Sequence, residues 1–297
     1  MASQEKVHAF PSSERRNCLP TEKKESPMAT AKFDFTNEVV LVSGAARGIG
    51  QAMVRQFGDA GATVVAVDRD AKGLMETKAL CPECHTVAAD IRDTEDVDRL
   101  FQFIATTFSR LDVCINNAAV APHQSLETYP TAVWDRVFDV NCKGTFLMTR
   151  AAAAVMRQAG IHGSIVNFSS AAAVKGGAGS TAYASSRAAV ESFSRIAAIE
   201  LAPYGIRVNT VRPGLIDTQP KPLPPSMREG LEKRIPTLLL QRAGQSEEVG
   251  NVAMFLSSSL SSYMTGSVVT VDGGSLSGTF PTTAVVEDDT RYSWLYD

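Results

Sequence analysis

The sequence predicts a single α/β domain built on a doubly wound parallel sheet of about seven strands. Short apolar runs rich in β-branched residues alternate with segments of helical spacing, a pattern typical of βαβ units. The first apolar run leads directly into a group of glycines, SGAARGIG at residues 43–50, which opens a helical segment. Right-handed crossovers between such strands place helices on both faces of the sheet.

The first half of the chain supplies four of the expected strands. Residues 39–42 (VVLV) and 63–67 (TVVAV) are continuous apolar runs, as in strands covered on both faces. The helix between them ends before Gly61, a favourable residue just past a helix end. Thr94 is expected to cap the third helix. The other expected elements of this half are helices 49–60, 71–80 and 94–108 and strands 86–89 and 111–115.

The second half is expected to continue the alternation. Residues 132–158 predict one long helix, Ala-rich in its second part. The other expected elements are strands 164–168, 207–211 and 267–271 and helices 183–201 and 246–256. Residues 215–244 interrupt the rhythm with five prolines. A long excursion between a strand and a helix is typical of an active-site flap, so this segment is predicted to be a substrate lid.

Composition and the chain ends narrow the class of protein. The chain has 297 residues, a formal net charge of −3 and no apolar run long enough for a membrane helix. We therefore expect neither a nucleic-acid partner nor a membrane partner. Residues 1–32 mix both charges with prolines and are expected to be a disordered extension. The domain is expected over 33–274, and the aromatic tail 275–297 is expected to pack on a neighbouring subunit or near the pocket.

The five cysteines contain one close pair, Cys81 and Cys84, in the run CPECH. The spacing matches a redox motif, but such a motif opens a helix after a strand, whereas here a strand follows. A loop with two thiols is the favoured interpretation. A zinc site needs a second pair of ligands that the sequence lacks, so no metal site is predicted. This cysteine usage predicts a reducing compartment, the cytoplasm.

The glycine group and the end of the second strand predict a dinucleotide site. Glycines there let backbone N–H groups approach a pyrophosphate at the positive end of a helix. Asp68 ends the second strand, where a carboxylate accepts hydrogen bonds from ribose hydroxyls and repels a 2′-phosphate. NAD is therefore expected in preference to NADP. Arg47 and Arg69 stand close enough in sequence to weaken that preference.

The spacing G-x-x-x-G-x-G, with further motifs in the same order, resembles the short-chain dehydrogenase/reductase family from about residue 32 to residue 274. The matching motifs are SGAARGIG (43–50), Asp90, NNAA (116–119), Asn141, Ser169-Ser170, Tyr183-x-x-x-Arg187, and Arg212-Pro213-Gly214 with Thr218. The run LLLQRAGQSEEVG (238–250) is similar to reductases of this family that act on 3-oxoacyl carriers. The resemblance implies a Rossmann-like fold and interconversion of a secondary alcohol and a ketone with NAD(H).

The resemblance also implies roles for individual residues. Tyr183 would exchange a proton with the substrate, Ser170 (or its neighbour Ser169) would orient the carbonyl, and Asn141 would steady a relay water. Ala119 replaces the usual glycine, and Asn116 would extend the floor of the cofactor site. The cofactor contacts implied are Gly44, Arg47, Gly48, Ile49, Gly50, Asp68, Asp90, Ile91, Asn117, Ala118, Tyr183, Arg187, Pro213, Gly214, Ile216 and Thr218.

Arg187 is the main departure from the family pattern, which has lysine four residues after the tyrosine. A guanidinium keeps the positive charge that lowers a tyrosine pKa, but it does not release its proton. Retained oxidoreductase chemistry is the leading expectation. The alternatives are a non-redox enzyme or ligand-binding protein on the same fold, and a subunit that only interacts. The resemblance further implies a homodimer or homotetramer through helices 132–158 and 183–201. An apolar pocket for a polyketide, terpenoid or acyl-type carbonyl is expected, typical of secondary metabolism.

Overall fold

The computed structural model describes residues 32–218 and 225–278, except for the side chains of 225–228. The chain divides into two units at the boundary between Lys32 and Phe33. The first unit, the expected charged extension, lies outside the described residues apart from Lys32, and so does the tail from residue 279 onward. The account below therefore concerns the second unit.

Seven parallel strands form the sheet of this unit, in the order β3-β2-β1-β4-β5-β6-β9. The strands are β1 (Val39–Ser43), β2 (Thr63–Asp68), β3 (His85–Ala88), β4 (Val113–Asn116), β5 (Ser164–Phe168), β6 (Arg207–Pro213) and β9 (Val268–Val271). The chain builds outward from β1 to β3, then returns to the other side of β1 with β4. This reversal places a crevice at the carboxyl ends of β1 and β4, where ligands bind in open α/β sheets.

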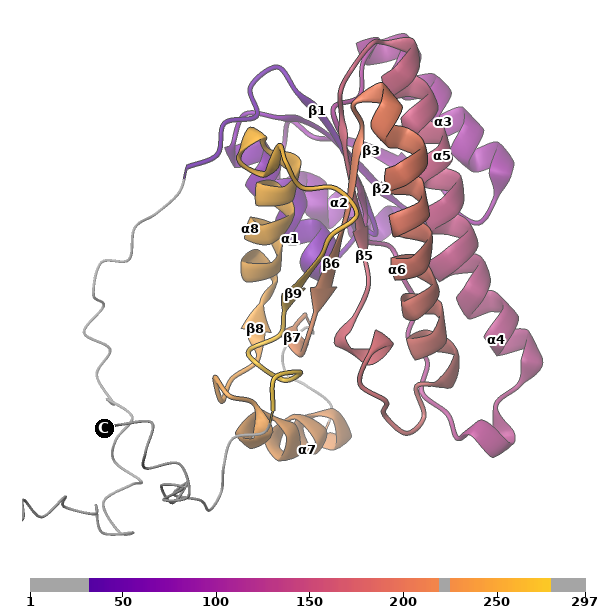
Figure 1. Cartoon of the computed structure of the whole chain (residues 1–297), viewed down its shortest axis with the longest axis vertical. Coiled ribbons are helices and arrows are strands. Elements are labelled where there is room, and N and C mark those ends of the chain that lie inside the picture. Colours follow the sequence, from indigo (N-terminus) through magenta and orange to yellow (C-terminus); the bar gives the residue numbers. More distant parts are fainter. Residues whose placement is uncertain (1–31, 219–224, 279–297) are drawn as a thin grey trace, which may run out of the picture. The chain divides into compact units, whose positions relative to one another are not determined.

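Helices cover both faces of the sheet (Figure 1). On one face lie α1 (Gly48–Asp59), α2 (Ala71–Leu80) and α8 (Ser246–Ser257), and on the other α3 (Thr94–Phe108), α5 (Thr145–Gln158) and α6 (Thr181–Leu201). Alternate residues of β1 enter the two cores: Val39 and Leu41 pack on the α3–α5–α6 side, and Val40 and Val42 on the α1–α8 side. The sequence prediction of a doubly wound, single-domain parallel sheet is confirmed.

Helix ends agree with the sequence expectation at α1 and differ at α3. Gly61 follows α1 with φ +88°, a left-handed conformation that glycine adopts without a steric penalty. The expectation that Thr94 caps α3 is wrong. Asp93 is the N-cap, and its carboxylate accepts a hydrogen bond from the Glu95 N–H (2.8 Å), while Thr94 is the first helical residue.

The long helix expected over residues 132–158 is interrupted in the structure. It consists of α4 (Thr131–Phe138), a π-helical segment (Asp139–Gly144) and α5. Such π segments are short and are frequent at functional sites. Gly144 packs closely against Ile91: a Cβ on Gly144 would stand 2.6 Å from Ile91 Cδ1. The expectation of one continuous helix is therefore wrong at the segment that carries Asn141.

A second, smaller sheet begins the segment that was predicted to be a lid. Two-residue strands β7 (Ile216–Asp217) and β8 (Gly244–Gln245) pair in parallel, and α7 (Pro225–Arg234) lies between them along the chain. Figure 1 shows α7 beyond the carboxyl ends of the large sheet, on the same side as the start of α6. Residues 219–224 of the segment lie outside the described residues. Within the described parts of the chain, none of the helices is long and apolar enough to cross a membrane.

Candidate active site

The turn after β1 is built from glycines because the backbone there passes very close to other chain segments. Gly44 has φ +68°, and a Cβ on it would stand 2.7 Å from Ala118 Cα. A Cβ on Gly50 would stand 2.0 Å from the carbonyl oxygen of Gly44, closer than any real contact. Gly48 also has a positive φ of +58°, and its position faces Thr218. The turn therefore presents bare backbone at the start of α1, with Arg47 as an exposed N-cap.

Asn117 ties this turn to the end of β4. Its Nδ2 donates to the carbonyl oxygens of Ser43 and Gly44, both at 3.1 Å. The Ser43 hydroxyl accepts from the backbone N–H of Asn117 (3.2 Å). Asn116, in contrast, is 2% exposed and points between sheet and helices, donating to Thr149 Oγ1 (3.0 Å) and Asn167 Oδ1 (2.8 Å). The expectation that Asn116 extends the cofactor floor is wrong, because its side chain is directed into the core.

Asp68 lies at the carboxyl end of β2, next to the glycine turn. Its Oδ2 accepts a hydrogen bond from the Ala46 N–H (3.2 Å), so the carboxylate is held beside the turn. Asp90 follows β3 and is bonded to the Arg92 guanidinium, with Oδ2 2.5 Å from Nη2. The hydrogen bond from Arg92 lowers the pKa of Asp90, keeping it ionised. Ile91 is only 7% exposed and its side chain belongs to the core.

Tyr183 lies in the first turn of α6, close to both Ser170 and Arg187. Ser170 follows β5, and its hydroxyl accepts from the Ala172 N–H (3.2 Å), which fixes the short turn after the strand. Burial raises the pKa of Tyr183, but the Arg187 charge and the polar groups of Ser170 and Arg187 beside the phenol outweigh burial, so the pKa is lowered overall. The structure therefore brings the predicted tyrosine, serine and arginine together.

Arg187 is 3% exposed and lies one turn after Tyr183 on α6. The guanidinium carbon is 5.3 Å from the centre of the Tyr183 ring, and Nη1 donates to the carbonyl oxygen of Phe168 (2.8 Å). Nε is buried without a hydrogen-bond partner. A buried donor left without an acceptor costs free energy, so this atom marks a position where an acceptor from a ligand would be stabilising.

Asn141 lies in the π-helical segment and is completely buried. Its side-chain amide makes two hydrogen bonds with the backbone of Val120, each 3.0 Å long, and a third with Ser186 Oγ (2.9 Å). The amide thus joins the loop after β4 to Ser186 on α6, the residue before Arg187. Its side chain has a structural role in the described contacts, and the π segment brings its backbone to the start of α6.

The chain leaves β6 through Pro213 and Gly214 and reaches the glycine turn. The Gly214 N–H donates to the carbonyl oxygen of Val271 (2.9 Å), which holds this corner on β9. Ile216 follows in β7, and Thr218 lies over Gly48, where a Cβ would stand 3.2 Å from Thr218 Cβ. Segments far apart in sequence therefore meet at one edge of the sheet, as the motifs predicted.

Glu191 and Arg212 form a buried ion pair that the sequence motifs did not indicate. Glu191 Oε1 and Oε2 accept from Arg212 Nε (2.8 Å) and Nη2 (2.7 Å), and Ser169 Oγ donates to Oε1 (2.6 Å). This buried group links α6, β6 and the end of β5. A glutamate four residues after Arg187 on a helix was the available sequence signal, but it predicts a pair with Arg187 rather than with Arg212.

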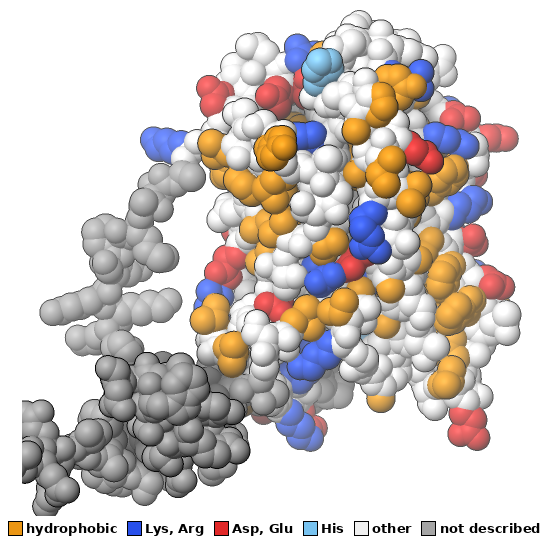
Figure 2. All heavy atoms as spheres, in the orientation of Figure 1, with side chains coloured by type: hydrophobic (Ala, Val, Ile, Leu, Met, Phe, Trp, Pro, Cys, Tyr) orange, Lys and Arg blue, Asp and Glu red, His pale blue; other side chains and the backbone are white. Residues whose placement is uncertain are grey.

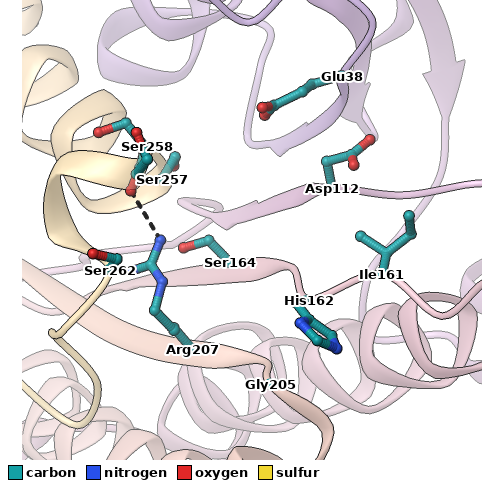
Figure 3. A pocket seen from close by; sticks show the side chains of 11 residues that line it. Glu38, Asp112, Ile161, His162, Ser164, Gly205, Arg207, Ser257, Ser258 and Ser262 are labelled. Carbon is teal, nitrogen blue, oxygen red and sulfur yellow. Dashed lines mark hydrogen bonds between the residues drawn. The ribbon is translucent and has the colours of Figure 1, made fainter.

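A hollow of about 400 Å³ lies at the opposite, amino-terminal edge of the sheet (Figure 3). Its lining includes Arg207 at the start of β6 and Ser164 at the start of β5. Arg207 donates to the carbonyl oxygens of Leu256 (2.9 Å) and Ser258 (3.2 Å), so it closes the end of α8. The hydroxyls of Ser164 and Ser257 also donate to backbone carbonyl oxygens, those of Leu256 (2.9 Å) and Ala253 (2.8 Å). Tyr183, Ser170 and Arg187 lie at the other edge.

Comparison with known proteins agrees with this geometry. Residues 44–275 match the family model described as enoyl-(acyl carrier protein) reductase. The chain is 38% identical to the 3-oxoacyl-acyl-carrier-protein reductase FabG of Thermotoga maritima, over 80% of this chain and 97% of that one. It is 36% identical to an NAD-dependent glycerol dehydrogenase of Listeria innocua, over 82% of this chain and 95% of that one.

A solved structure gives the same result at the level of the fold. The crystal structure of a short-chain type dehydrogenase/reductase from Mycobacterium marinum superposes with a TM-score of 0.76 at 30% identity, covering 82% of this chain and 97% of that one. Fold and site thus define an oxidoreductase that acts on CH–OH groups with a nicotinamide cofactor. The chain belongs to the short-chain dehydrogenase/reductase family.

The residues present fit a dinucleotide. The glycine turn packs tightly against Ala118 and Thr218 and opens α1 without side chains at Gly44, Gly48 and Gly50, and the N-terminal amide groups of that helix favour a pyrophosphate. The partnerless Nε of Arg187 on α6 provides a buried hydrogen-bond donor that a ligand acceptor could satisfy.

Proposed function

We propose that this protein is an NAD(H)-dependent oxidoreductase that interconverts a secondary alcohol and a ketone on a small or medium apolar substrate. The observation that carries the proposal is the grouping of Tyr183 with Ser170 and Arg187 beyond the carboxyl ends of the strands, where the Arg187 guanidinium lies 5.3 Å from the Tyr183 ring and the pKa of the phenol is lowered. Proton transfer to a substrate oxygen requires a positioned acid/base group whose pKa is close to the pH at which the enzyme works.

Each residue of the group has a separate task. In ketone reduction the Tyr183 phenol donates its proton to the substrate oxygen, and in alcohol oxidation the phenolate accepts it. Ser170 donates a hydrogen bond to the same oxygen and orients it. Arg187 stabilises the phenolate by its charge, and its free Nε donates to a ribose hydroxyl. When bound, the nicotinamide ring supplies or accepts the hydride. Asn141, through its backbone in the π segment, steadies the water that exchanges protons with solvent.

The cofactor extends along the crevice in this proposal. The turn of Gly44, Gly48, Ile49 and Gly50, with Arg47 beside it, binds the pyrophosphate. Asp90 and Ile91 hold the adenine, with the Asp90 oxygens and the Ile91 backbone as the contacts. The contacts proposed around the nicotinamide half are Asn117, Ala118, Tyr183, Arg187, Pro213, Gly214, Ile216 and Thr218.

Asp68 supports NAD rather than NADP. Its carboxylate stands at the end of β2 beside the Ala46 N–H, where a 2′-phosphate would meet a negative charge. The Listeria relative is named as NAD-dependent, which agrees with this preference. Arg47 and Arg69 are exposed at the same end and would favour a phosphate, so the preference rests on Asp68.

Apolar side chains at the mouth of the site support an apolar substrate. Val174 and Leu240 are 57% and 62% exposed, on the turn after β5 and in the segment between α7 and β8. Lys175 Nζ donates to the carbonyl oxygen of Ser275 (2.9 Å), and the Leu240 N–H donates to that of Gly273 (3.1 Å). Both segments are thereby held against the chain that follows β9. We assign residues 215–244 the role of substrate lid on this basis.

The test is direct. Titration with NADH should change the fluorescence of the reduced cofactor in a saturable manner, and a panel of apolar secondary alcohols and ketones should give turnover with NAD(H). Absence of binding by either dinucleotide would overturn the proposal. Saturable binding with turnover only for NADP(H) would show that the cofactor is NADP(H), while the proposed reaction would be retained.

A second candidate is a non-redox enzyme or ligand-binding protein on the same fold, and the observation that favours it is Arg187 at the lysine position. The variant Arg187→Lys separates the two. Turnover in the parent protein that changes in the variant supports the oxidoreductase. Absence of turnover in both forms, with a ligand still bound, supports the second candidate.

Assembly as a homodimer or homotetramer through α5 and α6 completes the proposal. Hydrophobic side chains are spread over the α6 side of the molecule (Figure 2). Phe146 on α5 and Ile196 and Ile199 on α6 are 42%, 52% and 70% exposed. Large apolar side chains left exposed on neighbouring helices support an interface between copies of the chain. We also assign the protein to the cytoplasm, which the unpaired thiols of the described cysteines support.

A further inference from the structure

Three functional groups stand in one row along α6. Tyr183, Arg187 and Glu191 are spaced four residues apart, so their side chains lie one above another on the same helix face. A glutamate four residues from an arginine ordinarily pairs with it. Such a pair would draw the guanidinium of Arg187 toward Glu191 and away from the Tyr183 phenol.

Glu191 is instead fully engaged by groups from other elements. Arg212 binds both carboxylate oxygens, through Nε (2.8 Å) and Nη2 (2.7 Å), and Ser169 donates to one of them (2.6 Å). The carboxylate is 6% exposed. Bidentate arginine–carboxylate contacts are short, strong and geometrically specific. Arg212 is held in turn by Thr270 Oγ1 at 3.3 Å from Nη1.

The Arg187 guanidinium is consequently directed toward Tyr183. It lies over the Tyr183 ring at 5.3 Å and donates to the Phe168 carbonyl oxygen (2.8 Å). We infer that Arg212 is a positioning residue which, by holding the Glu191 carboxylate, leaves the Arg187 guanidinium to Tyr183. This inference rests on the proposed function in treating Tyr183 as the acid/base.

The substitution of arginine for lysine at residue 187 makes such a device necessary. A guanidinium presents five donors in a rigid fork and matches a carboxylate bidentately, whereas an ammonium is a compact point charge on a flexible stem. Arg187 therefore has a strong competing partner four residues away. Arg212 lies on β6 and has the same rigid fork of donors. By binding Glu191, it prevents Glu191 from pairing with Arg187.

The other titratable groups near this row come from several elements. Cys142 in the π segment donates to the Ser186 carbonyl oxygen (3.4 Å), and burial raises its pKa against the opposing effect of Arg187. His123 lies 3.3 Å from Ser180 Oγ, and Lys175 is bonded to Ser275. Asp272 faces Arg212, and Arg195 faces Glu191. Among the described residues, Arg187 and Ser170 are the groups that lower the pKa of the Tyr183 phenol.

The experiment measures the ionisation of Tyr183 directly. The ultraviolet absorbance of tyrosinate is titrated against pH in the full-length protein, and the titration of Tyr183→Phe is subtracted. In Arg212→Gln the freed carboxylate of Glu191 pairs with Arg187, and the titration midpoint of Tyr183 should rise by about one pH unit. The double variant Glu191→Gln/Arg212→Gln removes the competing carboxylate, so its midpoint should return close to that of the parent.

The conservative variant Arg212→Lys provides the rescue. It keeps the charge beside Glu191 with fewer hydrogen bonds, so the midpoint should lie between those of the parent and Arg212→Gln. If Arg212→Gln does not fold, the ordering of parent, Arg212→Lys and the double variant decides the question. Unchanged midpoints in all folded variants, with only a lower melting temperature, would overturn the inference and leave the ion pair a purely structural contact.

This readout needs no turnover, so the inference and the proposed function fail separately. A raised midpoint in Arg212→Gln without any dinucleotide binding would reject the oxidoreductase and retain the positioning role. Dinucleotide-dependent turnover with an unmoved midpoint would do the reverse.

Discussion

At the scale of single residues, the chemistry depends on which charge stands beside Tyr183. Arginine remains protonated at every pH at which the protein is studied, whereas a lysine in this place titrates near pH 10. Arg187 therefore supplies a constant positive charge. The charge of Arg187 lowers the pKa of the Tyr183 phenol against the opposing effect of burial.

The first prediction follows from the lowered pKa of Tyr183. In alcohol oxidation, kcat/KM should rise with pH as the phenol ionises, then remain on a plateau, because Arg187 does not lose its proton. Tyr183→Phe should lower kcat by about 10²–10⁴-fold and abolish this rise. NADH binding, measured by fluorescence titration, serves as the control and should be nearly unchanged. A rise that persists in Tyr183→Phe would assign the acid/base role to another group.

The second prediction concerns Asp68. Asp68→Ala removes the negative charge beside the Ala46 N–H and should lower the KM for NADP by about tenfold, since one such contact is worth roughly 1–2 kcal/mol. The KM for NAD should rise in the same variant, because the ribose hydroxyls lose their acceptor. Asp98→Ala, an exposed change on α3, is the matched control and should alter neither value. If Asp68→Ala keeps the selectivity of the parent protein, Arg47 or Arg69 and not Asp68 distinguishes NAD from NADP.

The directions of the Asn116 and Asn117 side chains could not be predicted from the sequence. The motif locates both at the end of β4, but successive side chains of a strand point to opposite sides. Only the structure shows that Asn116 bonds Asn167 in the core and that Asn117 faces the glycine turn. The pairing of Glu191 with Arg212 was equally hidden, because it joins residues 21 positions apart.

At the scale of elements, the glycine turn permits a third prediction. Gly50→Ala would bring a Cβ within 2.0 Å of the Gly44 carbonyl oxygen, so the turn must move, and both NADH affinity and the melting temperature should fall. Gly230→Ala in α7 is the matched control, since its Cβ would meet nothing within 4 Å. There the melting temperature should stay the same or rise, because alanine favours a helix by about 1 kcal/mol over glycine. Full NADH affinity in Gly50→Ala would contradict the assigned role of the turn.

The strands and most helices were predictable from sequence because their hydrophobic patterns are long and regular. The runs VVLV in β1 and VVAV in β2 are apolar and completely buried. The break between α4 and α5 was not predictable: a π turn adds one residue to the helical ladder without requiring glycine or proline at its start. Strands β7 and β8 have two residues each, which is too short for any periodicity to be seen.

At the scale of the whole molecule, the exposed face of α6 leads to the fourth prediction. Ile199 is 70% exposed and Ile196 52% exposed on this helix. The double variant Ile196→Glu/Ile199→Glu should convert a dimer or tetramer into smaller species, because it introduces like charges at a self-complementary surface. Light scattering coupled to size-exclusion chromatography measures the change. Leu80→Glu, at an exposed site at the end of α2, is the control. A parent protein that is already monomeric would contradict the proposed assembly.

The reversal of the chain between β1 and β4 divides the molecule along its sequence as well as in space. Residues 39–90 carry the glycine turn, Asp68 and Asp90, and residues 113–218 carry Tyr183 and its partners. One recombination point in α3 would therefore exchange the adenosine-facing half for that of a relative while the reacting half stays intact. In the proposed function, the contacts to adenosine and the reacting groups are therefore carried by separate segments of the chain, so that one could be exchanged without the other.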